Sequence, residues 1–385
     1  MTNRQRTAHR ICAHLSTCLL LCGGLIAAPG ICSADAAPAA TPTLSQVLDN
    51  SGIFAAGYVS AGYIGSFNKG QILSDRVFDS DANTFELNQA ALILAHTPAE
   101  GFGGKAVIVA GSDAKVLNAF YGSGGSDLAL FIAYAQYATG PLTVIAGRFP
   151  ALSGEELALE PLNTNISRSL VLALAQPVPL TGIRANYAVT DNFTATLSVT
   201  NSDSFGSAAA LDDNKNKAIE AGGAWMPSKA FKLALYNYYS KESDADGGKN
   251  DIVDLVTSWQ ATRQLQLVLN GDYKRIFNTT TAGPASFTLG ADGYLNYQFD
   301  PKWSTSLRME ALQIKNEAAG SSTQLQEATL TGRYSATHSL RLLAEVRFDH
   351  ASADNFADGT LADGTPVLAK HDSEVGATVI YTFGL

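Results

Sequence analysis

Several stretches of this chain alternate strictly between apolar and polar residues. From Trp303 to Ala311, the odd positions are apolar or interfacial and the even positions carry a hydroxyl group or a charge. The same alternation recurs from Leu265 to Tyr273, from Leu340 to Phe348 and from Phe193 to Val199. Successive side chains of a β-strand point to opposite faces. Each stretch therefore predicts a strand with one apolar and one polar face.

Sixteen segments of this kind follow one another after residue 50. They are expected near 53–64, 84–95, 102–112, 128–138, 141–149, 180–190, 193–202, 217–226, 230–241, 251–262, 264–275, 286–299, 303–315, 324–336, 340–350 and 372–383. Tight turns alternate with longer connections rich in Gly, Asp, Asn and Ser. This rhythm is typical of a transmembrane barrel, which needs an apolar exterior and tolerates a wet lumen. We predict an all-β fold, a transmembrane antiparallel β-barrel of about 16 strands, with tight turns and both termini in the periplasm.

Aromatic residues recur where strands meet turns, as expected for rings at the lipid headgroup level. They are Phe193, Trp225, Phe231, Trp259, Phe299 and Trp303 near the tight turns, and Tyr239, Tyr273, Phe287 and Phe348 near the longer loops. The last strand places Val375, Ala377, Val379, Tyr381, Phe383 and Leu385 on one face. Such a terminal strand is a signal for the bacterial barrel-assembly machinery. A soluble β-sandwich or solenoid is the alternative, but the strands are long and uniform and no repeat is visible.

The first 36 residues are predicted to be a cleaved secretory signal. Three arginines precede an apolar run from Leu15 to Ala28, and Ala34 and Ala36 supply the small residues of a cleavage site. The run is shorter than the roughly 20 residues that span a bilayer. Residues 37–50 are then a short periplasmic segment, and residues 51–385 form the barrel.

All four cysteines lie within the predicted signal, so the exported chain contains none. An exported protein without disulfides must be stabilised otherwise, and closure of all strands into a barrel is one way. Removing three arginines and Asp35 from the 26 basic and 35 acidic residues leaves a net charge of −11. That balance argues against a nucleic-acid partner. It is also consistent with a lumen that favours cations, or simply with an acidic surface.

One connection, from Pro150 to Pro179, is much longer than the others. A surface loop this long is uncommon unless it has a function, and its apolar residues would be costly in water. We expect this third long loop to fold into the lumen as a constriction. Glu155, Glu156 and Glu160 would offer acceptors to a cation, and Arg148, Arg168 and Arg184 would face them. Opposed charges across a constriction favour polar solutes over apolar ones.

Strand parity also places charges of both signs toward the lumen. They are Arg308, Glu310, Arg333, Arg341, Glu345, Arg347, Asp272 and Lys274. A lumen of this kind favours a passive pore over a barrel adhesin or receptor, whose lumen can be plugged. Little more than 37–50 precedes the first strand, which is too short for a plug domain.

The sequence gives little support for an enzyme. Four histidines follow the signal, at His96, His338, His350 and His371, far apart in the sequence. Their spacing matches neither a serine triad nor a zinc site. The run from Arg347 to His350 is only a loose candidate for a lipid hydrolase. We predict no catalytic residues, no metal site and no cofactor.

The chain resembles the β-barrel porins of the OmpL-like class. The matching stretches are Ser51 to Ile53, Gly57 and Tyr58, Phe85 to Ala90, Gly147 to Phe149, Asn163, Ser167 to Ser169, Thr181 to Arg184, Tyr187, Asp254 to Val256, Gly293 and Tyr294, Tyr297 to Phe299, and Trp303 to Glu310. Before Ser167 the chain has Leu162 to Ile166 where the family is aromatic-rich, so constriction details are not carried over.

This resemblance implies an outer-membrane porin of Gram-negative bacteria that lets small hydrophilic solutes or ions diffuse passively. The implied partners are outer-membrane lipid and lipopolysaccharide, the assembly machinery and small polar solutes. Barrels of this size in the family are often homotrimers.

Overall fold

The computed structural model describes residues 48, 50–121, 124–177, 179–201, 215–241, 248–277, 286–317, 319–361 and 363–384. The predicted signal and most of the segment at 37–50 lie outside these residues. Residues 43–385 form one compact unit. No helix in the described part of the chain is long and apolar enough to cross a membrane.

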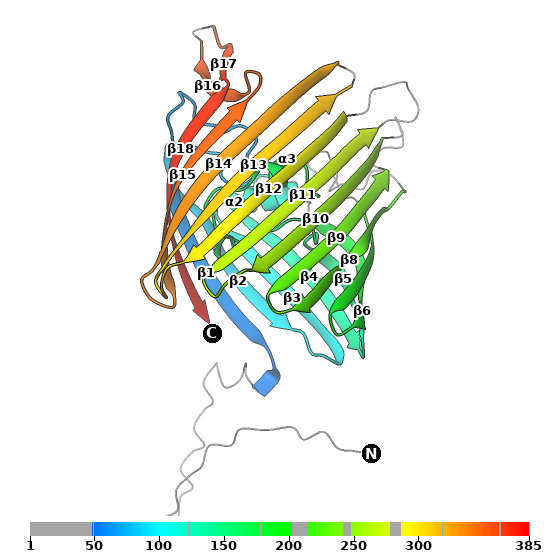
Figure 1. The fold of residues 1–385 in the computed structure, drawn as a ribbon. Coiled ribbons are helices and arrows are strands. Elements are labelled where there is room, and N and C mark those ends of the chain that lie inside the picture. The colour runs from blue at the N-terminus through cyan, green and yellow to red at the C-terminus, as the bar shows by residue number, and fades with distance from the viewer. Residues whose placement is uncertain are drawn as a thin grey trace, which may run out of the picture. The chain divides into compact units, whose positions relative to one another are not determined.

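Sixteen antiparallel strands form one closed barrel, which confirms the predicted fold class and strand count. They are β1 (Phe54–Ser66), β2 (Thr84–His96), β3 (Gly101–Ala110), β4 (Leu128–Thr139), β5 (Leu142–Phe149), β6 (Leu180–Thr190), β7 (Phe193–Thr200), β8 (Ala218–Ser228), β9 (Phe231–Lys241), β10 (Lys249–Gln260), β11 (Leu265–Phe277), β12 (Ser286–Gln298), β13 (Trp303–Asn316), β14 (Ser321–Ser335), β15 (Leu340–Ala351) and β18 (His371–Gly384). From β1 to β15, each strand pairs with the next strand in the chain. Strand β15 then pairs with β18, and β18 pairs with β1. Figure 1 shows the tilted strands with the short turns at one end and the longer connections at the other.

The first and last strands close the barrel. Their pairing runs from Ala56 opposite Gly384 to Ser66 opposite Glu374. Closure leaves no free edge among the sixteen strands, so their backbone N–H and C=O groups are paired within the wall. The side chain of Leu385, which was expected to continue the apolar face of this strand, lies outside the described residues.

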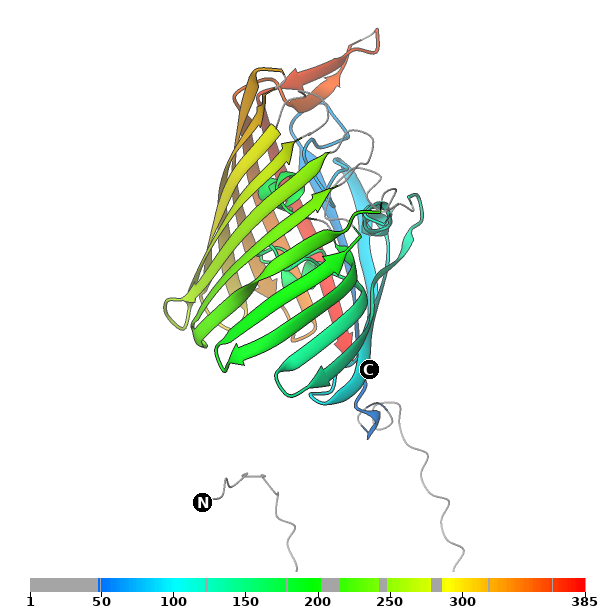
Figure 2. The same ribbon diagram turned by 90° about the vertical axis from the view of Figure 1, so that its right-hand side faces the viewer.

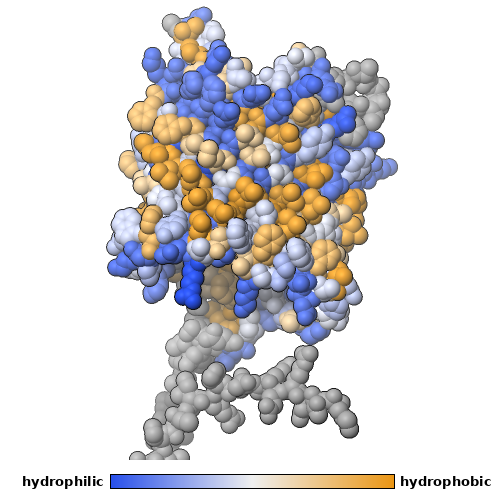
Figure 3. Space-filling view, viewed as in Figure 1, coloured by the Kyte–Doolittle hydropathy of each residue, from blue (hydrophilic) through white to orange (hydrophobic). Residues whose placement is uncertain are grey.

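Exposure along the strands alternates with a period of two. In β13, Trp303 is 51% exposed and Met309 is 60% exposed, whereas Ser306, Arg308 and Glu310, on the even positions, are buried. The exposed residues point outward, where Figure 3 shows a broad apolar band between two more polar ends. Trp225 and Phe231 meet edge to face near one end of the band, with ring centroids 6.1 Å apart.

In the described residues, two short helices and one 3₁₀ turn lie in the connections between strands. Helix α2 (Ser112–Ala119) follows β3, and the connection between β5 and β6 contains η1 (Glu160–Leu162) and α3 (Leu170–Leu174). Helix α3 buries Leu170 and Val171 against inward-facing Leu312 and Leu325. In Figure 2, helical turns coloured green are visible within the ring of strands.

A hairpin of β16 (Phe356–Thr360) and β17 (Pro366–Ala369) was not expected from the sequence. It forms a separate two-stranded sheet in the connection before β18. Its strands are short and lie in a Gly- and Asp-rich region, so neither shows a long alternating pattern. Phe356 is buried together with Leu170 and Ala351, which fixes the base of the hairpin on the barrel.

The outward register can be tested with a charge. Replacing Leu342, which is 44% exposed on β15, by Arg should block assembly, as should the same change at Leu267. Arginine facing lipid near the bilayer midplane costs roughly 2–4 kcal/mol. The yield of heat-modifiable barrel on gels measures assembly. The control is Ser258→Arg, because Ser258 faces inward on β10; equal yields for all three variants would contradict the register.

Candidate functional site

The connection of residues 150–179, here called the β5–β6 segment, is bonded to strands all around the barrel. Its main chain donates to Tyr238 Oη of β9 and to Asp254 Oδ2 of β10, at 2.9 and 3.0 Å. On another side, Gln89 of β2 donates to Ala158 O at 2.8 Å. Strands β13, β14 and β15 supply further partners. The segment therefore contacts inward-facing side chains of strands that are far apart in the barrel order.

Arg308 is the centre of these contacts. Its side chain is completely buried, and Nη1 lies 2.6 Å from Glu156 Oε1 of the β5–β6 segment. Nε lies 2.9 Å from Glu327 and 3.1 Å from Glu310, both on the barrel wall. Nη1 also donates to Ser167 O at 2.7 Å. A buried guanidinium is stabilised only when charges and acceptors surround it, and here the segment supplies part of that set.

Carboxylates of the wall bind the main chain of the segment in return. Glu345 of β15 accepts from the N–H groups of Ile166 and Ser167, at 2.7 and 2.9 Å. Glu310 of β13 accepts from Val171 N at 3.0 Å. Val171 lies in the first turn of α3, whose N–H groups have no partner within the helix. Strand carboxylates therefore hold the segment along much of its length.

A second connection also reaches the inner wall. Arg76, between β1 and β2, is buried and lies 3.3 Å from Asp79 and 2.9 Å from Asp349 of β15; it also pairs with Glu374 of β18. Burial raises the pKa of Asp79 to about 6, although Arg76 acts in the opposite direction. This connection was not among the candidate sites predicted from the sequence. Its only sequence signal is an arginine three residues before an aspartate in a loop.

Near β2, a cluster of polar groups lies beside the same segment. Gln89 donates to Asp113 Oδ2 of α2 at 2.6 Å and accepts from Glu160 N at 3.2 Å and from the hydroxyl of Tyr58. Burial raises the pKa of Asp113 and of Glu160, and their mutual repulsion raises that of Asp113 further. Arg168 lowers both pKa values by attraction.

The structure changes the predicted roles of the three glutamates. Both oxygens of Glu156 are bonded, to Arg308 and, at 2.6 Å, to Ser169 N. Glu160 is buried among the groups near β2. Glu155 is only partly buried; desolvation raises its pKa and nearby Lys232 lowers it. The expectation that all three would offer acceptors to a cation is therefore wrong for Glu156, because a buried arginine already neutralises it.

Of the arginines expected to face these glutamates, Arg168 lies close enough to Glu160 to lower its pKa, whereas Arg184 is placed differently. Arg184 binds Glu220 through two bonds of 2.7 and 2.9 Å on the inner wall. Arg168 donates to Leu157 O and Ile166 O within the segment.

Arg148 stacks over the ring of Tyr121 at 4.2 Å. It lies on the face of β5 opposite to buried Ile145, since the register of this pairing is unbroken. Its Nη1 also donates to Leu130 O of β4 at 3.3 Å, so these contacts join Arg148 to β4 and to the connection before it rather than to the three glutamates.

The remaining candidates lie on the inner wall. Arg347 binds Asp349 through two bonds and donates to Arg168 O at 2.6 Å. Arg333 donates to Asn163 O at 2.7 Å, and Arg341 donates to Pro161 O at 3.0 Å. All three bind the segment, which a strand pattern alone does not reveal.

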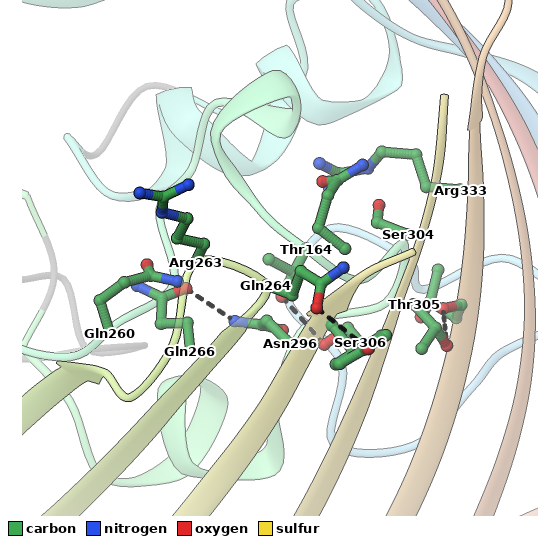
Figure 4. A pocket seen from close by; sticks show the side chains of 13 residues that line it. Thr164, Gln260, Arg263, Gln264, Gln266, Asn296, Ser304, Thr305, Ser306 and Arg333 are labelled. Atoms are coloured by element: carbon green, nitrogen blue, oxygen red, sulfur yellow. Dashed lines mark hydrogen bonds between the residues drawn. The ribbon is translucent and has the colours of Figure 1, made fainter. Parts of the chain in front are cut away.

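A cavity of about 320 Å³ lies beside the segment, near the short turns. We call it the vestibule. It is lined by Thr164, Gln260, Arg263, Gln264, Gln266, Asn296, Tyr297, Gln298, Ser304, Thr305, Ser306, Thr331 and Arg333. Figure 4 shows amide and hydroxyl groups between Arg263 on one side and Arg333 on the other.

Within the described residues, no group of three or more His, Cys, Asp or Glu side chains could hold a metal ion. The run from Arg347 to His350 does not form one site either. Arg347 and Asp349 are buried on the inner wall, whereas Phe348 is 58% exposed on the outer face. His350 stacks on His371 with centroids 4.5 Å apart.

Comparison with known proteins gives one family and several similar folds. The family described as "Putative beta-barrel porin-2, OmpL-like" matches residues 52–383. No curated protein matches the sequence.

Three solved structures show the same fold. OmpT of Vibrio cholerae, in a trimer form, has a TM-score of 0.60 at 9% identity and covers 86% of this chain and 99% of its own. OprB of Pseudomonas putida has a TM-score of 0.56 at 14% identity, covering 88% and 96%. An anion-selective porin from Comamonas acidovorans has a TM-score of 0.55 at 10% identity, covering 86% and 99%.

The Arg308 contacts predict that Glu156 holds the segment in place. Replacing Glu156 by Ala should weaken its docking by about 3–5 kcal/mol, because a buried guanidinium loses a partner. Hydrogen exchange of residues 156–170 in the assembled barrel should accelerate strongly. Glu155→Ala is the matched control and should change exchange little; equal exchange in the two variants would show that the Glu156 pair does not hold the segment.

The environment of Asp79 predicts a pH-dependent stability. Its folded pKa of about 6 lies above the ordinary value of 3.8, so folding favours the protonated form. Protonated Asp79 therefore adds about 3 kcal/mol to the free energy of unfolding below pH 4, and this contribution is lost as the pH rises through 6. Urea unfolding of the barrel between pH 4 and 7 measures this. Asp79→Asn should flatten that part of the profile, and an unchanged profile would contradict the assignment.

Proposed function

Because the chain belongs to the family described as "Putative beta-barrel porin-2, OmpL-like", we propose that it is a channel for passive diffusion of small hydrophilic solutes and ions. The protein is an outer-membrane β-barrel, as its family and the barrels of similar fold indicate. The observation that carries the proposal is the polar inner wall, which carries charged groups of both signs and contains the vestibule at one end.

The β5–β6 segment sets the width of the passage in this proposal. A segment bonded to β2, β10 and β15 at once crosses the inside of the ring, because strands so far apart in the barrel order share only its interior. Side chains of Arg308 and Glu345 fix its position on one side. Rigid positioning favours a permanent constriction over a mobile gate, since the buried ion pairs would have to separate for the segment to move.

The constriction residues divide into two kinds. Glu156, Glu160, Arg168, Arg308, Glu310 and Arg347 are buried and hold the segment against the wall. Glu155, Arg333 and Arg341 are only partly buried, and we assign the lining of the passage to them. Arg184 braces the neighbouring wall through Glu220. Charges that are neutralised in buried pairs contribute little to ion selection, so the partly buried charges determine it.

An adhesin or receptor and a lipid-hydrolysing barrel are less well supported. The candidate hydrolase residues are divided between the two faces of β15. The partners that fit a porin are outer-membrane lipid, lipopolysaccharide, the assembly machinery acting through the terminal strand, and small polar solutes. Homotrimer formation is part of the proposal, and the trimer form of the Vibrio cholerae barrel supports it.

Conductance across a planar lipid bilayer tests this function. The barrel should give stable, ohmic current steps in potassium chloride. Thr164 lines the vestibule on the segment side, and the exported chain has no cysteine. The Thr164→Cys channel should therefore lose current when a sulfonated methanethiosulfonate reagent modifies it.

Ala319→Cys is the control, because Ala319 is exposed in the turn between β13 and β14. Its current should not respond to the same reagent. A correctly assembled barrel without conductance would refute the diffusion channel. A conducting Thr164→Cys channel that is modified without loss of current would show that the passage runs elsewhere.

A further inference from the structure

The vestibule differs in charge from the rest of the inner wall. Among its thirteen lining residues there are two arginines and no aspartate or glutamate. The carboxylates of the wall lie farther along the strands. On β13, for example, Glu310 follows Ser304 and Ser306, which line the vestibule. A solute in the vestibule therefore meets positive charge and neutral polar groups.

The guanidinium groups of Arg263 and Arg333 have N–H donors that can bind a ligand. Arg333 uses Nη2 to donate to Asn163 O, and its buried Nε has no partner among the described residues. Arg263 is exposed in the turn between β10 and β11. Arg341 lies diagonally across from Arg333 on β15, because Ser335 is its register partner. Guanidinium groups pair with oxyanions through planar, parallel N–H donors.

Glu345, a wall carboxylate beside the vestibule, has its acceptors occupied by other partners. Glu345 lies opposite Thr331 of the vestibule, but it accepts bonds from Ile166 N, Ser167 N and the Thr331 hydroxyl. Its two carboxylate oxygens are therefore bonded to the β5–β6 segment and to Thr331. The electrostatic potential in the vestibule is therefore dominated by the positive charges of Arg263 and Arg333.

The other lining groups suit hydroxyl-rich molecules. Gln266 donates to Ser258 and accepts from Asn296, at 3.0 and 3.1 Å, so these amides are held in fixed orientations. The buried Oδ1 of Asn296 has no partner in the described structure. Amides and hydroxyl groups both donate and accept hydrogen bonds, and the hydroxyl groups of a polyhydroxylated solute need both kinds of partner. The cavity volume is within the range of about 300–1,000 Å³ that holds small molecules.

We propose that the vestibule is a binding site for small polyhydroxylated carboxylates, such as sugar acids. Arg263 or Arg333 pairs with the carboxylate, and the amides and hydroxyl groups between them bind the hydroxyl groups of the solute. This inference rests on the proposed channel function and specifies the solute class. It replaces the cation preference expected from the sequence with a preference for anions.

Three probes of nearly equal size test it: glucuronate, glucose and glucosamine. Flux into proteoliposomes should be fastest for glucuronate and slowest for glucosamine. Glucuronate should also reduce the potassium chloride current in a saturable way. In a salt gradient the reversal potential should show a preference for chloride over potassium.

The matched variants are Arg263→Gln, Arg333→Gln and their combination. At low salt each change should lower the anion-to-cation ratio roughly sixteenfold, because a unit charge about 5 Å away in water raises the local concentration of an anion and lowers that of a cation by roughly fourfold each. Lys229→Gln removes a positive charge at the same end of the barrel, from an exposed turn outside the vestibule, and should leave the ratio unchanged. Heat modifiability on gels confirms that each variant is assembled.

The outcomes separate the two proposals. A wild-type barrel without conductance refutes the channel itself. A conducting barrel that passes glucosamine as fast as glucuronate refutes the anion site and leaves the channel intact. Unchanged selectivity in the double variant also overturns the site, because the preference would then come from charges elsewhere.

Discussion

The backbone of every strand in this barrel has to bond to its neighbours, and the pairing of β1 with β18 completes that requirement. Once the ring is closed, side-chain alternation divides each strand between an apolar exterior and a polar interior. The interior then carries many charged side chains that are buried from water, Arg308 and Glu345 among them. Arg308 and Glu345 find their partners in the β5–β6 segment. Closure of the barrel thus directs charged side chains to the inner wall, and the β5–β6 segment supplies partners for Arg308 and Glu345 among them.

Much of the wall could be predicted from the sequence, because its pattern is local. The expected strand near 303–315 is observed as Trp303–Asn316, and the one near 372–383 as His371–Gly384. Alternation over ten or more residues leaves only one register that keeps charges out of lipid. The hairpin of β16 and β17 is too short to show this pattern.

The interior could be predicted only in outline. The length and apolar content of residues 150–179 indicated a functional loop, but the partner of each charge depends on contacts between residues far apart in the chain. Glu156 meets Arg308, which is 152 positions away, and Arg76 meets Asp349. No spacing rule links such residues. Arg148 was expected to face the loop glutamates, but its observed partners are Tyr121 and Leu130 O, which no local pattern indicates.

The segment that crosses the barrel also has a mechanical consequence. A hollow cylinder of strands resists stretching along its hydrogen bonds but flattens easily under pressure from the side. Bonds from one segment to Asp254 of β10 and to Gln89 of β2, which lie on opposite sides of the ring, act as a tie across the diameter. Such a tie transfers lateral load from the surrounding membrane between the walls. The tie therefore limits how far the two walls can move apart, while the number of strands and their stagger set the diameter of the ring.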